Sequence, residues 1–260
     1  MTIDGEMLRN LSHNVHTNET IQNGALRILR TVGLTLGDLP GKSILDLGSG
    51  PRFLERKVNS DGINAKVVSY DIDFETLSKA NDNKVSAVQG TIHEGLPFKF
   101  DAFDLVINVG GPLRGGPANS DVIEMYINAI KTLKENGEIR IYNPFRGVGG
   151  IAEYLYYLDR KGKLAIRRED IETVYYEEEP EYDDRGMPYP MYPGDDFWFH
   201  EYYKLPKEQQ LAYSIDLTKL LEEELRHKGV NISLRLEEPD KDSKDYDPFL
   251  IIKRLITESK

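Results

Sequence analysis

Apolar residues recur along the chain in two alternating patterns. Short apolar runs at 43–47, 65–73, 85–90 and 103–109 are typical of buried parallel strands. The segments between and before them have helical spacing, and residues 17–32 place the following side chains on one helical face: Ile21, Ala25, Ile28, Leu29 and Val32. Regular alternation of this kind predicts a parallel sheet with helices on both faces.

The second half of the chain continues and then closes this pattern. Residues 119–137 predict a helix capped by Asn119 or Ser120 and ended by Gly137, followed by a fifth strand at 138–145. Residues 214–229 predict a further amphipathic helix. Two apolar runs, 230–238 and 248–255, are joined by a polar loop that favours a hairpin. We therefore expect an α/β fold: a doubly wound, mostly parallel seven-stranded sheet with a C-terminal antiparallel hairpin.

An acidic, aromatic-rich segment interrupts the pattern after the fifth strand. Residues 172–203 hold ten acids and one base, Arg185, so this segment carries −9 of the net charge of −11. It also holds seven of the fifteen tyrosines, and four prolines deny it a long helix: Pro180, Pro188, Pro190 and Pro193. We interpret residues 150–210 as an inserted lid or substrate segment, with a solvated surface loop or an oligomer contact as the alternative.

Composition narrows the function classes. The chain has no cysteine, which excludes disulfides, thiolate metal sites and a cysteine nucleophile. A net charge of −11 disfavours a nucleic-acid partner. Residues 1–16 lack a signal pattern and no apolar run reaches membrane-spanning length, so we expect a cytoplasmic protein without a membrane partner. His13 and His16 lack a third ligand in sequence, and no metal site is predicted.

The first strand ends in a pattern that indicates a small-molecule pocket. Asp46 is followed by Gly48 and Gly50 where a helix begins, so a ligand could approach the backbone and the free N–H groups of the helix start. About twenty residues further on, Asp71 ends the second strand, where an acid can accept both ribose hydroxyls. Phe53 stands where a dinucleotide fingerprint needs its third glycine. These features favour a cofactor that contains adenosine but no diphosphate.

Five segments in order resemble the class I S-adenosylmethionine-dependent methyltransferases. They are LDLGSGP, VVSYDIDFETLSKA, VQGTIHEGLPF, FDAFDLVINVGG and LKENGEIRIYNP. The closing hairpin is similar to the sixth and seventh strands of that family, one of which runs antiparallel to the rest. The resemblance covers roughly residues 17–145 and 211–257, and it implies a single methyltransferase-like domain over 1–260 with S-adenosyl-L-methionine as cofactor and S-adenosyl-L-homocysteine as product.

The resemblance also implies a set of cofactor-binding residues. These are Asp46, Gly48, Ser49, Gly50, Arg52, Asp71, Ile72, Thr91, Ile92 and Asn108. The glycines would pass beneath the methionine part and Asp46 would hold the loop or its bound water. Asp71 would bind the ribose, while Ile72 would pack on the adenine face.

The remaining implied cofactor-site residues would contact the adenine edge and the methionine end of the ligand. Thr91 and Ile92 would flank the adenine edge, and Asn108 would lie near the methionine end and the substrate. Two positions depart from the family pattern. Arg52 replaces a small residue, so it would either pair with the cofactor carboxylate or fill part of the pocket. Thr91 replaces an acid, and its hydroxyl can still hydrogen-bond the adenine amino group.

The acceptor side is less defined. His200, in the aromatic stretch DDFWFHEYY, is the candidate general base for an oxygen or nitrogen nucleophile. Aromatic faces with carboxylates suit an amine-bearing or aromatic small molecule. The leading hypothesis is methyl transfer to such a molecule, with a homodimer as an open possibility. The alternatives are a non-catalytic protein that keeps the fold, and an NAD(P)-dependent oxidoreductase, which Phe53 and the closing hairpin disfavour.

Overall fold

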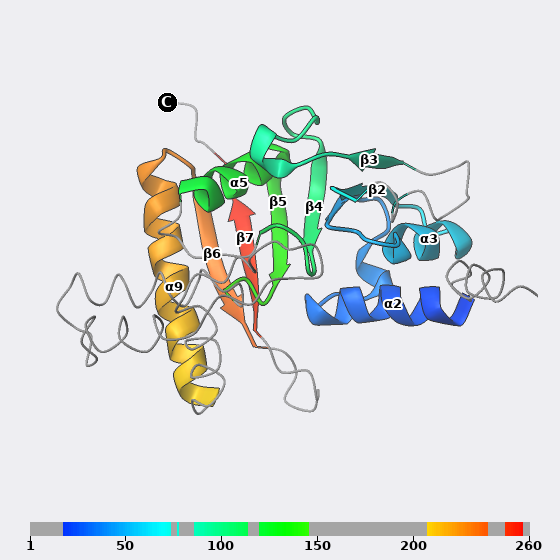
Figure 1. Ribbon diagram of the computed structural model, residues 1–260, viewed down its shortest axis with the longest axis horizontal. Coiled ribbons are helices and arrows are strands. Elements are labelled where there is room, and N and C mark those ends of the chain that lie inside the picture. Colours follow the sequence, from blue (N-terminus) through cyan, green and yellow to red (C-terminus); the bar gives the residue numbers. More distant parts are fainter. Residues whose placement is uncertain are drawn as a thin grey trace, which may run out of the picture.

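A seven-stranded sheet forms the centre of the protein, with strand order β3-β2-β1-β4-β5-β7-β6 (Figure 1). The computed structural model describes residues 18–73, 77, 86–113, 120–145, 207–238 and 248–256. The strands are β1 (Ser43–Leu47), β2 (Lys66–Asp71), β3 (Ala87–Gln89), β4 (Phe103–Asn108), β5 (Leu133–Tyr142), β6 (Ile232–Glu237) and β7 (Phe249–Arg254). β7 pairs antiparallel with both β5 and β6, and the other pairs are parallel. The predicted fold class is confirmed.

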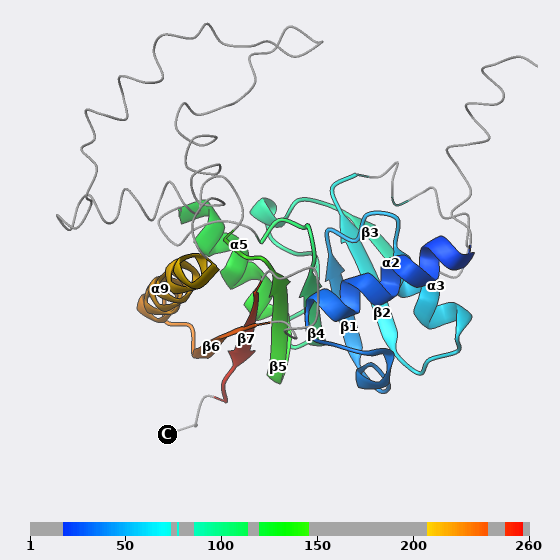
Figure 2. The same cartoon turned by 90° about the horizontal axis from the view of Figure 1, so that it is seen from below.

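Helices cover both faces of this sheet (Figure 2). The described helices are α2 (Asn18–Thr31), α3 (Phe53–Ser60), α5 (Ser120–Lys131) and α9 (Lys207–His227), with short 3-10 turns η1 (Leu36–Asp38) and η2 (Ile92–Glu94). Side chains of α2 and α3 pack with one side of the sheet, and those of α5 and α9 pack with the other. Within β1, Ile44 packs in the core on the α2 and α3 side, and Leu45 and Leu47 pack in the core on the α5 and α9 side. Burial on both faces explains why β1 reads as a continuous apolar run.

The helical face predicted for the N-terminal helix is the face that the structure buries. Ile21, Ala25, Ile28 and Leu29 on α2, and Val32 just after it, are all at most 8% exposed. The i, i+4 and i, i+7 spacing of these residues puts them on one side of a 3.6-residue helix, and burying that side against α3 and the sheet removes it from water.

The boundary between α5 and β5 differs from the sequence prediction. The helix ends at Lys131 rather than at Gly137, and β5 begins at Leu133. β5 pairs with β4 at Leu133, shifts register, and resumes pairing at Glu138, so the residues between form a bulge. Within it, Asn136 has a φ of 61° and a Cβ on Gly137 would lie 2.9 Å from the Lys134 carbonyl oxygen. The Asn-Gly pair therefore turns the chain inside a strand and does not cap the helix.

Two sequence predictions fall outside the described residues. They are the inserted segment over 150–206, with its candidate base His200, and the pair of His13 and His16. The last residues of the predicted insertion, 207–210, instead form the start of α9. Across the described ranges, no helix is both long enough and apolar enough to span a bilayer.

Candidate functional site

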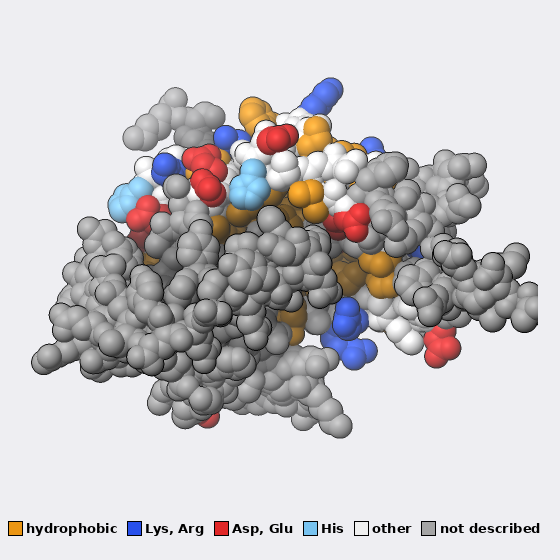
Figure 3. Space-filling model, in the orientation of Figure 1, with side chains coloured by type: hydrophobic (Ala, Val, Ile, Leu, Met, Phe, Trp, Pro, Cys, Tyr) orange, Lys and Arg blue, Asp and Glu red, His pale blue; other side chains and the backbone are white. Residues whose placement is uncertain are grey.

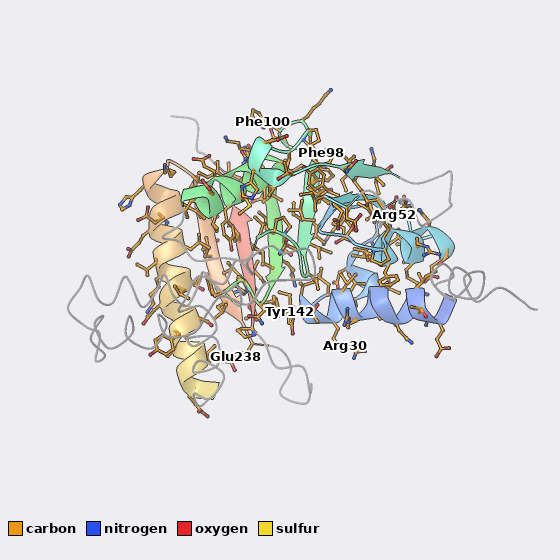
Figure 4. All side chains as sticks on the ribbon, viewed as in Figure 1. Arg30, Arg52, Phe98, Phe100, Tyr142 and Glu238 are labelled. Atoms are coloured by element: carbon orange, nitrogen blue, oxygen red, sulfur yellow. The ribbon has the colours of Figure 1, made fainter. Side chains whose placement is uncertain are left out.

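The carboxyl ends of β1, β2 and β4 meet at one edge of the sheet. β1 lies between the other two strands, and Leu47 is in register with Tyr70 on one side and with Asn108 on the other. The chain runs outward from β1 to β3 and then returns to place β4 beside β1. Ligands of open α/β sheets bind in the crevice at such a reversal of strand order. Figure 4 shows Tyr142 and Glu238 near this edge and Phe98 and Phe100 at the opposite one.

Two loops touch backbone to backbone in this crevice. Gly48, at the end of β1, has a φ of +70°, and a Cβ there would lie 2.4 Å from the Cα of Gly111 in the loop after β4. A Cβ on Gly111 would in turn lie 2.4 Å from the Leu47 carbonyl oxygen. The N–H groups of Gly48 and Ser49 donate to the Tyr70 carbonyl at 2.8 and 3.2 Å. Only glycine fits at these two positions, and the loop after β1 is fixed between β2 and β4.

Asp71 ends β2 with its carboxylate held in a defined orientation. Its Oδ2 accepts from the Gly50 N–H at 2.8 Å, and its Oδ1 accepts from the Asp73 N–H at 3.0 Å. A carboxylate has further lone pairs for ligand hydroxyls. Ile72 follows directly with 70% of its surface exposed. An oriented carboxylate beside an exposed apolar side chain suits a ribose joined to a flat base.

Five buried polar side-chain atoms at this edge have no hydrogen-bond partner among the described residues: Asp46 Oδ2, Ser49 Oγ, Asn108 Nδ2, and Nε and Nη2 of Arg52. Asn108 Oδ1, by contrast, accepts from the Leu113 N–H at 3.3 Å. Buried polar groups are nearly always paired in folded proteins, so each of these atoms calls for a partner. A carboxylate, a hydroxyl and an amide donor together suit a ligand that carries both an ammonium and a carboxylate group.

Burial sets the protonation of Asp46. It raises the pKa of the Asp46 carboxyl from 3.8 to about 7, and the nearby carboxylates of Glu55 and Asp71 contribute to the rise. A bound cation would favour the charged form and lower that pKa again. A cation that binds at this residue would therefore cause the carboxyl to release its proton near neutral pH.

Thr91 and Ile92 lie at the start of η2, beyond β3. The Thr91 hydroxyl accepts from the His93 N–H at 3.4 Å, a long bond that leaves its own proton for another acceptor. The Ile92 side chain is 2% exposed and belongs to the core beneath α5. Its carbonyl accepts from Asn128 Nδ2 at 3.3 Å. The Ile92 side chain thus serves packing, and Thr91 is the half-exposed member of the pair.

Arg52 is buried, with 4% of its surface exposed, and has a φ of 61° at the N-terminus of α3. Its Nη1 donates to the Leu77 carbonyl at 2.9 Å, and its Nε lies 3.3 Å from Glu55 Oε2. Nη1 and Nε therefore face groups of the protein, whereas Nη2 has no hydrogen-bond partner among the described residues. Phe53, the next residue, packs against Gly24 of α2, where a Cβ would lie 2.4 Å from the ring.

Sequence reasoning missed Glu55 and the contact of Gly111. Glu55 is 2% exposed and accepts from Ser69 Oγ at 2.7 Å and from the Ser86 N–H at 2.8 Å. The signal for Glu55 was its position three residues after Arg52, on the same side of a helix. The signal for Gly111 was a Gly-Gly pair directly after a buried strand.

A groove of about 580 Å³ lies at the opposite edge of the sheet. Its walls include Phe100 before β4, Ile127 and Lys131 on α5, and Arg254 at the end of β7. This edge carries the amino ends of the parallel strands, whereas ligands of this fold class bind at the carboxyl ends. The groove is not part of the candidate site.

Comparison with known proteins identifies the fold family. A family model described as "Methyltransferase domain" matches residues 38–165, the stretch from before β1 past β5. This match supports a relationship to the class I S-adenosylmethionine-dependent methyltransferases. The strand order and the single antiparallel strand agree with the resemblance noted in the sequence. The same match supports S-adenosylmethionine as the cofactor.

Solved structures of similar fold span most of the chain. A putative S-adenosylmethionine-dependent methyltransferase from Methanococcus maripaludis is 14% identical with a TM-score of 0.46, covering 95% of this chain and 99% of its own. One from Aquifex aeolicus is 14% identical with a TM-score of 0.44, covering 93% and 100%. Human N-acetylserotonin methyltransferase in complex with S-adenosylmethionine is 16% identical with a TM-score of 0.45, covering 92% and 54%. No curated protein matches the sequence.

The residues at the carboxyl edge fit this cofactor. The unpaired Asp46 Oδ2, Ser49 Oγ and Asn108 Nδ2 offer partners for the ammonium and carboxylate of the methionine part. The Asp71 carboxylate and the exposed Ile72 offer partners for the ribose and the adenine. A side chain at Gly48 or Gly111 would collide with the backbone of the facing loop.

Proposed function

We propose that this methyltransferase transfers a methyl group from S-adenosylmethionine to an oxygen or nitrogen nucleophile of a small molecule. The observation that carries the proposal is the trio of buried, unpaired polar atoms on Asp46, Ser49 and Asn108, next to the oriented carboxylate of Asp71. Leaving such groups without partners costs about 1–3 kcal/mol each, and a ligand that pairs them offsets that cost.

Each part of the site has a proposed role. Asp71 accepts from the ribose hydroxyls and Ile72 covers one face of the adenine. Thr91 bonds the adenine edge through its hydroxyl. Asp46 receives the ammonium group, directly or through water, and the amide of Asn108 donates to an acceptor at the methionine end. S-adenosylmethionine supplies an electrophilic methyl group, so what the chain contributes is alignment and exclusion of water.

The small-molecule acceptor is inferred from charge and composition. The net charge of −11 opposes a polyanionic substrate. On the face shown in Figure 3, acidic and basic side chains of the described residues lie interspersed. The aromatic and acidic residues of 172–203 would form a lid that suits an amine-bearing or aromatic acceptor, with His200 as general base. That segment is outside the described residues, so the lid rests on composition alone.

The test is calorimetric titration with S-adenosylmethionine and S-adenosylhomocysteine. In Asp71→Asn, an amide replaces the carboxylate and removes charge-assisted acceptors for the ribose, so the affinity should fall about tenfold or more. Asp61→Asn is the matched control because Asp61 pairs with Lys57 at 2.9 Å on the surface of α3. Absence of binding to the wild-type protein would overturn the proposal, and equal losses in both variants would remove Asp71 from the site.

A further inference from the structure

A buried ion pair connects segments that contact the two ends of the proposed cofactor site. Arg52 directly follows the glycine loop, and its Nη1 reaches the Leu77 carbonyl beyond Asp71 and Ile72 at 2.9 Å. Its Nε lies 3.3 Å from Glu55. Figure 4 shows Arg52 in the region between β2 and α3. One guanidinium thus spans from the loop at the methionine end to the segment at the adenosine end.

Glu55 extends this connection to β2 and to the start of β3. It accepts from Ser69 Oγ at 2.7 Å and from the Ser86 N–H at 2.8 Å. Arg52 and Glu55 are both under 5% exposed, so neither charge is compensated by solvent. A buried charge needs a partner, and each of these residues supplies the partner of the other.

Arg52 has a left-handed backbone conformation, in which a residue with a side chain is strained. A φ of 61° is a conformation in which glycine is favoured and a side chain costs about 1–2 kcal/mol. The interactions of the arginine side chain must therefore offset the free-energy cost of this backbone conformation. Its bond to Leu77 and its ion pair with Glu55 are the interactions that a glycine could not make.

We propose that Arg52 is a positioning residue that fixes the glycine loop against Leu77, whose N–H donates to the Asp73 carbonyl beside Asp71 and Ile72, so that both halves of S-adenosylmethionine meet a preformed site. The inference rests on the proposed function, because it assigns how that same site is held in shape. In this role Arg52 acts through Leu77 and Glu55. Its removal weakens a ligand that bridges both segments more than a ligand that contacts one.

The experiment compares the affinities of S-adenosylhomocysteine and adenosine by calorimetry, well below the melting temperature of every variant. Arg52→Met alone leaves Glu55 buried without a cation, so Arg52→Met/Glu55→Gln, which removes both charges, is the main variant. Its affinity for S-adenosylhomocysteine should fall about tenfold, with a smaller loss for adenosine. Arg52→Lys, which keeps the charge without the planar fork, should recover part of the loss.

Arg140→Met is the matched control. Arg140 Nε pairs with Glu138 at 2.6 Å and its Nη1 donates to the Val32 carbonyl at 2.9 Å, the same arrangement at a site on β5. This variant should melt at a lower temperature and bind both ligands as the wild type does. A folded double variant with wild-type affinity, or equal losses for both ligands, would overturn the inference. No binding by the wild type would instead sink the proposed function.

Discussion

The two edges of the sheet treat polar side chains in opposite ways. At the carboxyl edge, Asp46 Oδ2 and Asn108 Nδ2 are buried without a partner. At the amino edge, the Asp104 carboxylate accepts from the Ser43 N–H at 2.7 Å and from Lys134 Nζ at 2.8 Å. Arg254 there pairs with Asp101 and donates to the Leu133 carbonyl.

The difference separates groups that serve the fold from groups that serve a ligand. Both edges belong to the same strands and the same hydrophobic cores, so packing alone does not explain the buried polar atoms that lack a partner at the carboxyl edge of the described structure. Since such atoms reduce the stability of the folded chain, their retention at the carboxyl edge points to a compensating ligand. Substitutions at the two edges should therefore separate stability from binding.

The largest expected effect is that of Gly48→Ala. The new Cβ would lie 2.4 Å from the Cα of Gly111, a backbone atom that cannot move aside, at a φ of +70°. We expect a loss of about 2–4 kcal/mol in the free energy of unfolding. Because the displaced loop carries the N–H groups that fix the site, binding of S-adenosylhomocysteine should be lost as well. Urea unfolding and calorimetry measure the two effects.

Gly62→Ala is the control for the cost of placing a side chain at a positive φ. Gly62 has a φ of +65° but no atom within 4 Å of the added Cβ. This variant should lose about 1–2 kcal/mol and keep its ligand affinity. If Gly48→Ala costs no more than Gly62→Ala, the close approach of the two loops is not what requires glycine.

Asp46→Asn should raise stability and lower affinity at the same time. The pKa of Asp46 is raised to about 7, so the folded protein holds a proton that the unfolded chain releases above 3.8. Its contribution to stability is thus fully present below pH 3.8 and lost as the pH rises through about 7. The variant lacks this loss, so its stability relative to wild type should rise by about 2 kcal/mol between pH 5 and pH 8.

The same substitution, Asp46→Asn, should weaken ligand binding although it raises stability. The neutral amide cannot compensate an ammonium group, so affinity for S-adenosylhomocysteine should fall in Asp46→Asn. In the wild type that affinity should rise between pH 6 and pH 8, and in the variant it should not. Chemical unfolding at several pH values and calorimetry in two buffers test both. A variant that is less stable at pH 8 would contradict the buried, unpaired carboxyl.

The sequence allowed the strands to be predicted, together with the strand ends at which the candidate site residues lie. Asp46, Gly48 and Asp71 stand at the ends of apolar runs, where local pattern fixes both the element and its edge. The contact of Gly48 with Gly111 depends on β1 pairing with β4, which local sequence does not encode. The α5–β5 boundary was misplaced because Asn-Gly after a helical run is also the signature of a helix end.

The burial of Glu55 could not be predicted from local sequence either. An acid three residues after a base on a helix is usually a solvent-exposed pair worth a few tenths of a kcal/mol. Here the pair is buried because Ser69, Ser86 and Leu77 close around it. Burial of a charged pair is decided by tertiary contacts, and periodicity does not carry that information.

The smallest expected effect comes from the amino edge. In Lys134→Met, the ion pair with Asp104 is lost, but Lys134 is 41% exposed and Asp104 keeps its bond from the Ser43 N–H. Such a pair is worth about 0.2–1 kcal/mol, so the melting temperature should fall slightly and more at low salt than at high salt. Affinity for S-adenosylhomocysteine should stay at the wild-type value, since this edge binds no part of the cofactor. A loss of affinity in Lys134→Met would mean that the two edges are coupled through β4 and β5, and that the amino edge also serves the ligand.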